Sequence, residues 1–258
     1  MARTLGFGLV VLVAAIATVL VIAPAQWAAA ALAKTTGGRV LLAETTGTLW
    51  NGQATLVFAP SADAGVARAS LPERLAWRLS PWSLLAGTVN LMVSHPSALT
   101  QALPIRVTLD GRVEAGGTTL RLPASLLVGL GAPWNTVRPG GVISVTWDRI
   151  AIESGRLKGN LVAEWQFASS ALSPVSPFGH YRLQTNGVFP GTQLNLLTIS
   201  GPLELTGSGT IAEGGRLRFQ GLARAAPSAD AAVKTQLTGL ISLLGRRDGE
   251  SAILNFGS

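Results

Sequence analysis

The stretch Ile143-Ser144-Val145-Thr146-Trp147-Asp148 alternates apolar and polar side chains one residue at a time. A period of two places each kind of side chain on its own face of an extended strand, as in a half-buried antiparallel strand. The segment Leu161–Phe167 repeats the pattern, with every odd-numbered side chain apolar. These stretches predict a sheet with one apolar and one polar face.

Further strands and turns extend the pattern along the chain. The same alternation occurs in Ile105–Asp110, Leu194–Leu196, Leu203–Thr206 and Arg216–Gln220. Residue pairs that accept positive φ recur between such segments, at Asn51-Gly52, Asp110-Gly111, Gly116-Gly117, Asn186-Gly187 and Gly214-Gly215. We also interpret Gly207-Ser208-Gly209 as a turn. Short strands joined by such turns predict a mainly β protein built as a curved antiparallel sheet or open barrel, with one or two short helices.

Two segments break the alternation and predict helices. Ser125–Leu130 follows Pro123 and predicts a short helix. Ala231–Leu244 has apolar residues at helical spacing, so we expect a longer helix that Asp230 caps and that closes one end of the sheet. The segments 59–71 and 223–229 are rich in Ala, Ser, Gly and Pro and are predicted loops, and Ser251–Phe256 is a predicted last strand.

Composition excludes several classes of protein. The 258 residues are 48% hydrophobic and only 13% charged, which excludes a largely disordered chain. The chain has no cysteine, so it has neither disulfides nor thiolate chemistry. Its formal net charge of +7 comes mostly from arginines scattered singly along the predicted strands. Without a basic cluster or a nucleic-acid motif, we expect no nucleic-acid partner.

The amino-terminal segment predicts a membrane anchor. Leu5–Ala23 is an apolar run without a charge, and as a helix it would nearly cross a hydrocarbon core of ~30 Å. Arg3 precedes the run and Trp27 follows it, as interfacial anchors do. The alternative is a signal peptide cleaved after Ala31-Leu32-Ala33, but the run is longer than the ~7–15 apolar residues of a typical signal.

These features predict four regions. Residues 1–4 form a short cytoplasmic start and 5–23 an uncleaved transmembrane helix. Residues 24–46 form a periplasmic connector with the first strand, and 47–258 a periplasmic β-rich domain. Either interpretation of the amino terminus, anchor or signal peptide, places the remainder outside the cytoplasm.

The chain lacks the patterns that usually carry chemistry. Its two histidines, His95 and His180, have no metal-ligand spacing around them, and there is no G-x-S-x-G motif or phosphate loop. We therefore predict no enzyme, no metal and no cofactor. Trp82 and Trp134 each follow a proline in loop-like contexts, and with Trp50 they are candidates for a partner surface. The alternative for these tryptophans is core packing, which we expect for tryptophans on strands.

The order of the motifs resembles that of a known family. The segments are Gly47–Gly52 (a Gly-Thr-x-Trp-x-Gly hairpin), Leu75–Pro81, Leu84–Gly87, Leu157–Gly159, Trp165, Pro177–Arg182, Leu205–Gly209, Arg216–Gly221 and Leu243–Arg247. In this order they resemble protein N of the type II (general) secretion pathway. The resemblance implies an inner-membrane protein with one membrane span and a periplasmic domain, which helps to move folded proteins from the periplasm to the medium. It implies no enzymatic activity, no cofactor and no catalytic residues.

Three functions remain open. The first is a non-enzymatic subunit that binds other secretion subunits and the lipid bilayer, through exposed strand edges and tryptophan-bearing loops. The second is a membrane-anchored lipid-handling module, in which an open curved sheet leaves an apolar trough for an acyl chain. The third, a hydrolase of the cell envelope, ranks last because no nucleophile–base pair is evident.

Overall fold

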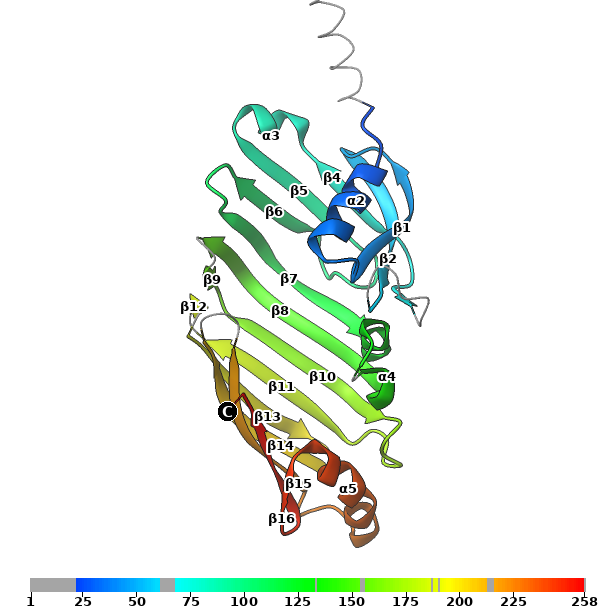
Figure 1. The fold of residues 1–258 in the computed structure, drawn as a ribbon, viewed down its shortest axis with the longest axis vertical. Coiled ribbons are helices and arrows are strands. Elements are labelled where there is room, and N and C mark those ends of the chain that lie inside the picture. Colours follow the sequence, from blue (N-terminus) through cyan, green and yellow to red (C-terminus); the bar gives the residue numbers. More distant parts are fainter. Residues whose placement is uncertain are drawn as a thin grey trace, which may run out of the picture.

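The computed structural model describes residues 22–60, 68–132, 134–153, 156–186, 188–189, 191–212 and 216–257. A single long, curved sheet runs the length of the molecule, with the helices placed along it (Figure 1). Of the predicted transmembrane segment 5–23, only Ile22 and Ala23 belong to the described residues, and Arg3 lies outside them. No helix in the described ranges is long and apolar enough to cross a membrane.

The elements follow one another along the chain with these bounds: α2 Gln26–Thr35, β1 Val40–Gly47, β2 Asn51–Phe58, β3 Ala69–Ser70, β4 Leu75–Leu79, α3 Pro81–Leu85, β5 Thr88–Ser94, β6 Leu103–Thr108, β7 Val113–Pro123, the 3₁₀ helix η1 Ala124–Leu130, α4 Trp134–Val137, β8 Pro139–Glu153, β9 Arg156–Lys158, β10 Leu161–Ser170, β11 Gly179–Asn186, β12 Val188–Phe189, β13 Thr192–Ser200, β14 Leu203–Ile211, β15 Leu217–Ala225, α5 Ala231–Leu244, β16 Arg246–Asp248 and β17 Ser251–Phe256.

The strands form a meander, as their short connections predict. The longer strands pair antiparallel in the order β1-β2-β4-β5-β6-β7-β8-β10-β11-β13-β14-β15-β17, and the short strands β3, β9, β12 and β16 extend this sheet. Among the described strands, β1 pairs only with β2, and β17 only with β15 and β16, so the sheet is open. The prediction of a mainly β, open antiparallel sheet is thereby confirmed.

The register shows how alternation in sequence becomes two faces in space. Val145, Ala163, Leu183 and Leu196 lie directly opposite one another on four neighbouring strands, and the row continues through Gly207, Gly221 and Leu254. The adjacent row contains Gln184, Asn195, Ser208, Gln220 and Asn255. Since neighbouring residues on a strand point to opposite faces, one face of this half of the sheet is apolar and the other polar.

Helical segments cover parts of the apolar face. The largest core cluster packs Leu237, Leu240 and Ile241 of α5 against strand residues such as Phe219 and Leu254. A second cluster joins Ala25, at the start of α2, with Ala54 and Trp77, and a third joins Leu126 of η1 with Leu71 and Ala98. Figure 1 shows α2, α4 and α5 following one another along the sheet, with α5 at the end opposite α2.

The predicted helices form, with differences at their ends. Helix α5 has the predicted bounds, but the Asp230 carboxylate makes no capping hydrogen bond, and only its backbone carbonyl accepts a bond from the Lys234 N–H. The short predicted helix at 125–130 is a 3₁₀ helix. Helix α2 lies within the predicted connector 24–46 and was not anticipated from the sequence.

Two predicted loops are partly strands. β3 lies inside the predicted loop 59–71, of which residues 61–67 lie outside the described part. β15 continues to Ala225, into the predicted loop 223–229. β3 pairs with β2, and β15 pairs with β14. This pairing gives hydrogen bonds to backbone N–H and C=O groups that would be solvated in a loop.

Candidate functional site: an apolar trough

The apolar face of the sheet contains a trough of about 560 Å³. This volume lies within the range of ~300–1,000 Å³ found for small-molecule sites. Its lining comes from β8, β10, β11, β13, β14, β15 and β17, with η1 and α4 at one side. The lining residues are Leu127, Trp134, Pro139, Ile143, Ala163, Glu164, Trp165, Tyr181, Leu183, Leu194, Leu196, Leu205, Leu217, Phe219 and Phe256.

Glycines give one wall of the trough its shape. Phe219 is buried, and its ring atoms lie where side chains on three neighbouring glycines would be. A Cβ on Gly207 would lie 2.5 Å from Phe219 Cζ, and Cβ atoms on Gly209 and Gly221 would each lie 3.0 Å from a Phe219 ring carbon. Because these three positions carry no side chain, the Phe219 ring can lie close to the backbone of the glycines. Phe256 continues the wall, with its ring centre 6.2 Å from that of Phe219.

Gly207-Ser208-Gly209, interpreted from the sequence as a turn, lies in the middle of β14, so that prediction was wrong. The physical reason is the ring of Phe219: these glycines make room for an aromatic side chain on the neighbouring strand and do not reverse the chain.

The aromatic residues of the opposite wall have no polar atom left for a ligand. The Tyr181 hydroxyl donates to the Leu203 carbonyl at 2.9 Å, and the Trp165 indole N–H donates to the Gly140 carbonyl at 2.8 Å. Burial raises the pKa of the Tyr181 hydroxyl far above its ordinary value, so this group stays protonated. The two rings lie with their centres 6.1 Å apart and pack with the ring of Phe178.

Among the described lining residues Glu164 is the only acidic one. It lies between Ala163 and Trp165 on β10, so its carboxylate points to the opposite, polar face, where it is paired. Its Oε1 accepts from Nε and Nη2 of Arg182 at 2.8 and 2.7 Å, and Gln166 donates to Oε2. Burial raises the pKa of Glu164, but the hydrogen bonds from Arg182 and Gln166 and the charges on Arg182 and His180 outweigh it and hold the pKa below its usual range. The trough can therefore hold a ligand mainly through apolar contact.

The predicted site tryptophans do not form one surface. Trp134 lies on α4 and lines the trough, with 37% of its surface exposed. Trp82 projects from α3 with 77% exposure, and Trp50 is half-buried in the β1–β2 turn, near the start of α3. Trp27 lies on α2 and is half-exposed. Of the strand tryptophans, Trp77 is buried in a core cluster and Trp165 packs half-buried against another, as expected for core residues. Trp147 on β8 is half-buried and belongs to none of the three clusters.

The histidines do not form a catalytic or metal-binding arrangement. His95 is buried, and its Nδ1 accepts from the backbone N–H groups of Ser97 and Ala98. His180 Nε2 lies 3.6 Å from Glu164 Oε2, which is too long for a hydrogen bond. Within the described residues, no three His, Cys, Asp or Glu side chains gather closely enough to hold a metal ion.

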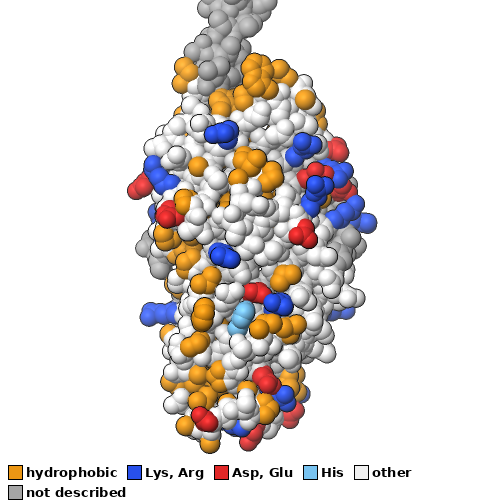
Figure 2. All heavy atoms as spheres, turned by 180° about the vertical axis from the view of Figure 1, so that it is seen from behind, with side chains coloured by type: hydrophobic (Ala, Val, Ile, Leu, Met, Phe, Trp, Pro, Cys, Tyr) orange, Lys and Arg blue, Asp and Glu red, His pale blue; other side chains and the backbone are white. Residues whose placement is uncertain are grey.

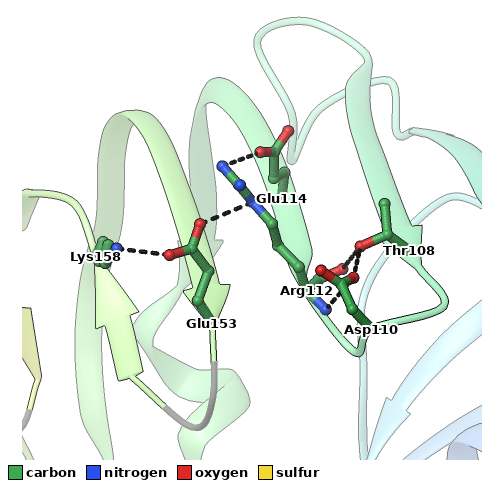
Figure 3. A network of polar contacts seen from close by, with 6 residues as sticks. All are labelled: Thr108, Asp110, Arg112, Glu114, Glu153 and Lys158. Carbon is green, nitrogen blue, oxygen red and sulfur yellow. Dashed lines mark hydrogen bonds and ion pairs between the residues drawn. The ribbon is translucent and has the colours of Figure 1, made fainter.

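The most extensive polar cluster lies at the β6–β7 turn and the neighbouring strand ends (Figure 3). Arg112 bridges Glu114 at 2.6 Å and Glu153 at 2.8 Å, and Glu153 also pairs with Lys158. Asp110 accepts from the Thr108 hydroxyl, and this bond lowers its pKa, as the bond from Lys158 lowers that of Glu153. Every carboxylate drawn is bonded to a neighbour, so the network fastens the turn and offers no free general base.

Comparison with known proteins identifies the family. A model of the type II secretion system (T2SS) protein N matches residues 38–254, which span every strand from β1 to β16 and the first four residues of β17. No curated protein and no solved structure matches the chain. The matched range includes the hairpin at Gly47–Gly52 and the closing segment at Leu243–Arg247. The chain belongs to the type II secretion system protein N family.

Proposed function

We propose that this chain is a non-enzymatic subunit of the type II secretion system, held in the inner membrane by residues 5–23, with its sheet in the periplasm. There it supports the export of folded proteins across the outer membrane through contacts with other inner-membrane subunits. The observation that carries the proposal is the family match over residues 38–254. The charge-free apolar run Leu5–Ala23 supports the anchor.

The polar groups of the described residues support a binding role over a catalytic one. The carboxylates of the two clusters, around Glu164 and around Arg112, are all engaged in ion pairs or hydrogen bonds. In the apolar trough the Tyr181 hydroxyl and the Trp165 indole N–H are bonded to backbone carbonyls and are not free to act on a substrate. A β sheet with apolar surface left over suits a subunit that recognises other molecules by contact.

The test is purification of the full-length, tagged chain from membranes in mild detergent, followed by mass spectrometry of what accompanies it. We expect other inner-membrane secretion subunits to co-purify, and the chain to resist extraction by alkaline carbonate. A reporter enzyme that works only in the periplasm, fused after Ser258, should be active. A chain that purifies without any secretion subunit, or whose loss leaves exoprotein secretion unchanged, would contradict the proposal.

A second candidate function is lipid handling, and the trough is the observation that favours it. Its walls are aliphatic and aromatic, and the Trp165 indole N–H and the Tyr181 hydroxyl donate to backbone carbonyls. A cavity with this lining suits an acyl chain better than a polar metabolite. In this function the chain would carry or shield a lipid tail while anchored in the same membrane.

Lipid extracted from the purified full-length chain tests this second function. One lipid class held in fixed ratio supports it, and absence of lipid argues against it. Ala163→Phe places a ring in the trough and should remove the lipid. Val162→Phe, on the next residue and the opposite face, is the matched control and should leave the lipid in place.

A further inference from the structure

The end of the sheet that carries α3 has an exposed apolar tip. Trp82 and Leu85 of α3 are 77% and 83% exposed, and Leu109 in the β6–β7 turn is 90% exposed. Leu109 belongs to the same tip, because a Cβ on Gly87 would lie only 2.8 Å from Leu109 Cδ1. We define the apolar tip as Trp82, Leu84, Leu85 and Leu109.

The exposure of the tip is built into the fold. The buried Ser83 hydroxyl donates to the Ser80 carbonyl at 2.7 Å and accepts from the Asn90 N–H at 3.1 Å. Pro81 occupies the first turn of α3, where its missing N–H costs nothing. With Ser83 fixed inward, its neighbours Trp82 and Leu85 are held outward. On a loose segment these two apolar side chains could turn inward and bury themselves. The hydrogen-bonded turn prevents this, so Trp82 and Leu85 stay exposed as a contact surface.

The tip lies close to the point where the apolar run 5–23 joins the domain. The Ala23 carbonyl accepts from the Leu49 N–H at 2.7 Å, and the adjacent Trp50 carbonyl accepts from the Leu79 N–H at 2.7 Å. Leu79 is two residues before Pro81, where α3 begins. Since paired strands lie ~5 Å apart, these bonds place Ala23 within a few strand widths of α3. Figure 1 shows α3 and the start of α2 at the same end of the molecule.

The composition of the tip matches a membrane interface. The stretch 81–88 carries no charge, and tryptophan is one of the side chains enriched at the boundary between headgroups and acyl chains. Figure 2 shows hydrophobic side chains gathered at this end, with Lys and Arg side chains below them.

A basic groove of about 710 Å³ begins beside α3. Its lining includes Pro81, Arg78, Arg106 and Arg149, with Glu114 as the only acidic residue. Arg106 donates to the Asn90 side chain, whereas the guanidinium groups of Arg78 and Arg149 have no ion-pair partner among the described residues. Cations beside an apolar tip complement the phosphates of an anionic bilayer.

We propose that the apolar tip enters the interface of the same bilayer that holds residues 5–23, with the basic groove facing anionic headgroups. The proposal rests on the anchor of the proposed function and adds a second membrane contact. A single span leaves a domain free to tilt and rotate, and a second contact a few strand widths away fixes its orientation. The sheet then extends from the membrane with α5 at its distal end.

The absence of cysteine makes a direct test possible. Full-length Leu85→Cys carries one environment-sensitive fluorophore and is reconstituted in vesicles of phosphatidylethanolamine and phosphatidylglycerol. Leu243→Cys on α5, 67% exposed and at the opposite end of the molecule, is the matched control. We expect the Leu85 label to shift to the blue and to be quenched by nitroxide-labelled lipids, and the Leu243 label to show neither effect.

The outcomes separate the tip from the anchor. If the chain resists alkaline extraction but the Leu85 label behaves like the Leu243 label, the anchor stands and the tip proposal is wrong. A blue shift without quenching by the lipid nitroxides means that protein covers the tip, which also overturns the proposal. Alkaline extraction of the chain overturns the anchor and with it the idea of a second contact. Quenching of the Leu85 label, which is measured before extraction, would then report a tip that binds the bilayer by itself.

A second measurement tests the groove. Replacing phosphatidylglycerol by phosphatidylcholine should lower the quenched fraction of the Leu85 label. Arg78→Gln should reduce that dependence on anionic lipid, since the groove loses a cation without an ion-pair partner. A quenched fraction that is identical in both lipids overturns the role of the groove.

Discussion

Phe219 lies against Gly207: a Cβ on that glycine would come within 2.5 Å of Phe219 Cζ and 2.7 Å of the Gln220 carbonyl oxygen. The two residues are on neighbouring strands, β14 and β15, and the ring occupies the space that a side chain at 207 would take. Phe219 belongs at once to the core under α5 and to the wall of the trough. Its position therefore couples the stability of the distal end to the shape of the cavity.

Gly207→Ala should destabilise the protein, because the new methyl group meets both a ring and a backbone oxygen. We expect a loss of about 1–3 kcal/mol in the free energy of unfolding, the usual range for overpacking. Urea unfolding followed by tryptophan fluorescence measures it. A variant as stable as the parent would show that the ring moves freely and that Gly207 has no packing role.

Gly239→Ala is the matched control. Gly239 lies in α5, exposed, with no atom within 4 Å of a Cβ built on it. Alanine at a helix position is favoured over glycine by about 0.5–1 kcal/mol, so this variant should be more stable than the parent. If Gly207→Ala lowers the free energy of unfolding and Gly239→Ala raises it in the same assay, the contact with Phe219 decides the effect at 207. The general difference between glycine and alanine would then not explain it.

Leu237→Ala should loosen α5 from the sheet. Leu237 is fully buried in the cluster that joins α5 to β15 and β17. Removing its side chain leaves a cavity, and such changes cost about 2–5 kcal/mol. Hydrogen exchange should become faster in α5 and in β17 first. Leu243→Ala, on the exposed side of the same helix, should change the stability by less than about 0.5 kcal/mol.

Alternation in the sequence predicted the fold well where each strand has one face covered. In β8 and β10 the alternation in sequence matches the two faces seen in the strand pairing. Ala231–Leu244 shows a helical period because one side of that helix packs on the sheet. Small residues misled the interpretation. Gly116-Gly117 was taken as a turn but lies within β7, where a Cβ on Gly117 would lie 2.3 Å from the Asp148 carbonyl oxygen. Sequence alone does not distinguish a glycine that reverses the chain from one that admits a neighbour.

The trough and the apolar tip could be predicted only in part. An open apolar sheet was expected to leave a trough, but its lining depends on which strands become neighbours, and residues from Leu127 to Phe256 meet there. Trp82 was expected in a loop-like context and lies on the short helix α3. Its relation to Leu109 and to Ala23 depends on pairing between distant segments, which no local pattern in the sequence reveals.

The ion pair between Glu164 and Arg182 should make stability depend on pH in the acid range. Interactions on the folded protein lower the pKa of Glu164, so its contribution to stability is present above the unfolded value of ~4.3 and is lost as the pH falls through the folded value. Glu164→Gln should therefore be less stable than the parent near neutral pH, and the difference should shrink towards zero in acid. Urea unfolding at a series of pH values measures it.

Arg182→Gln completes the test, because it removes the partner and leaves the carboxylate. Its stability should fall less steeply in acid than that of the parent, since Glu164 then loses its main donor and its pKa returns towards the ordinary value. In the double variant, Glu164→Gln should add little to Arg182→Gln, because residues in direct contact do not act additively. A difference between parent and Glu164→Gln that stays constant from neutral pH into acid would show that this carboxylate stabilises the sheet by packing and not by its charge.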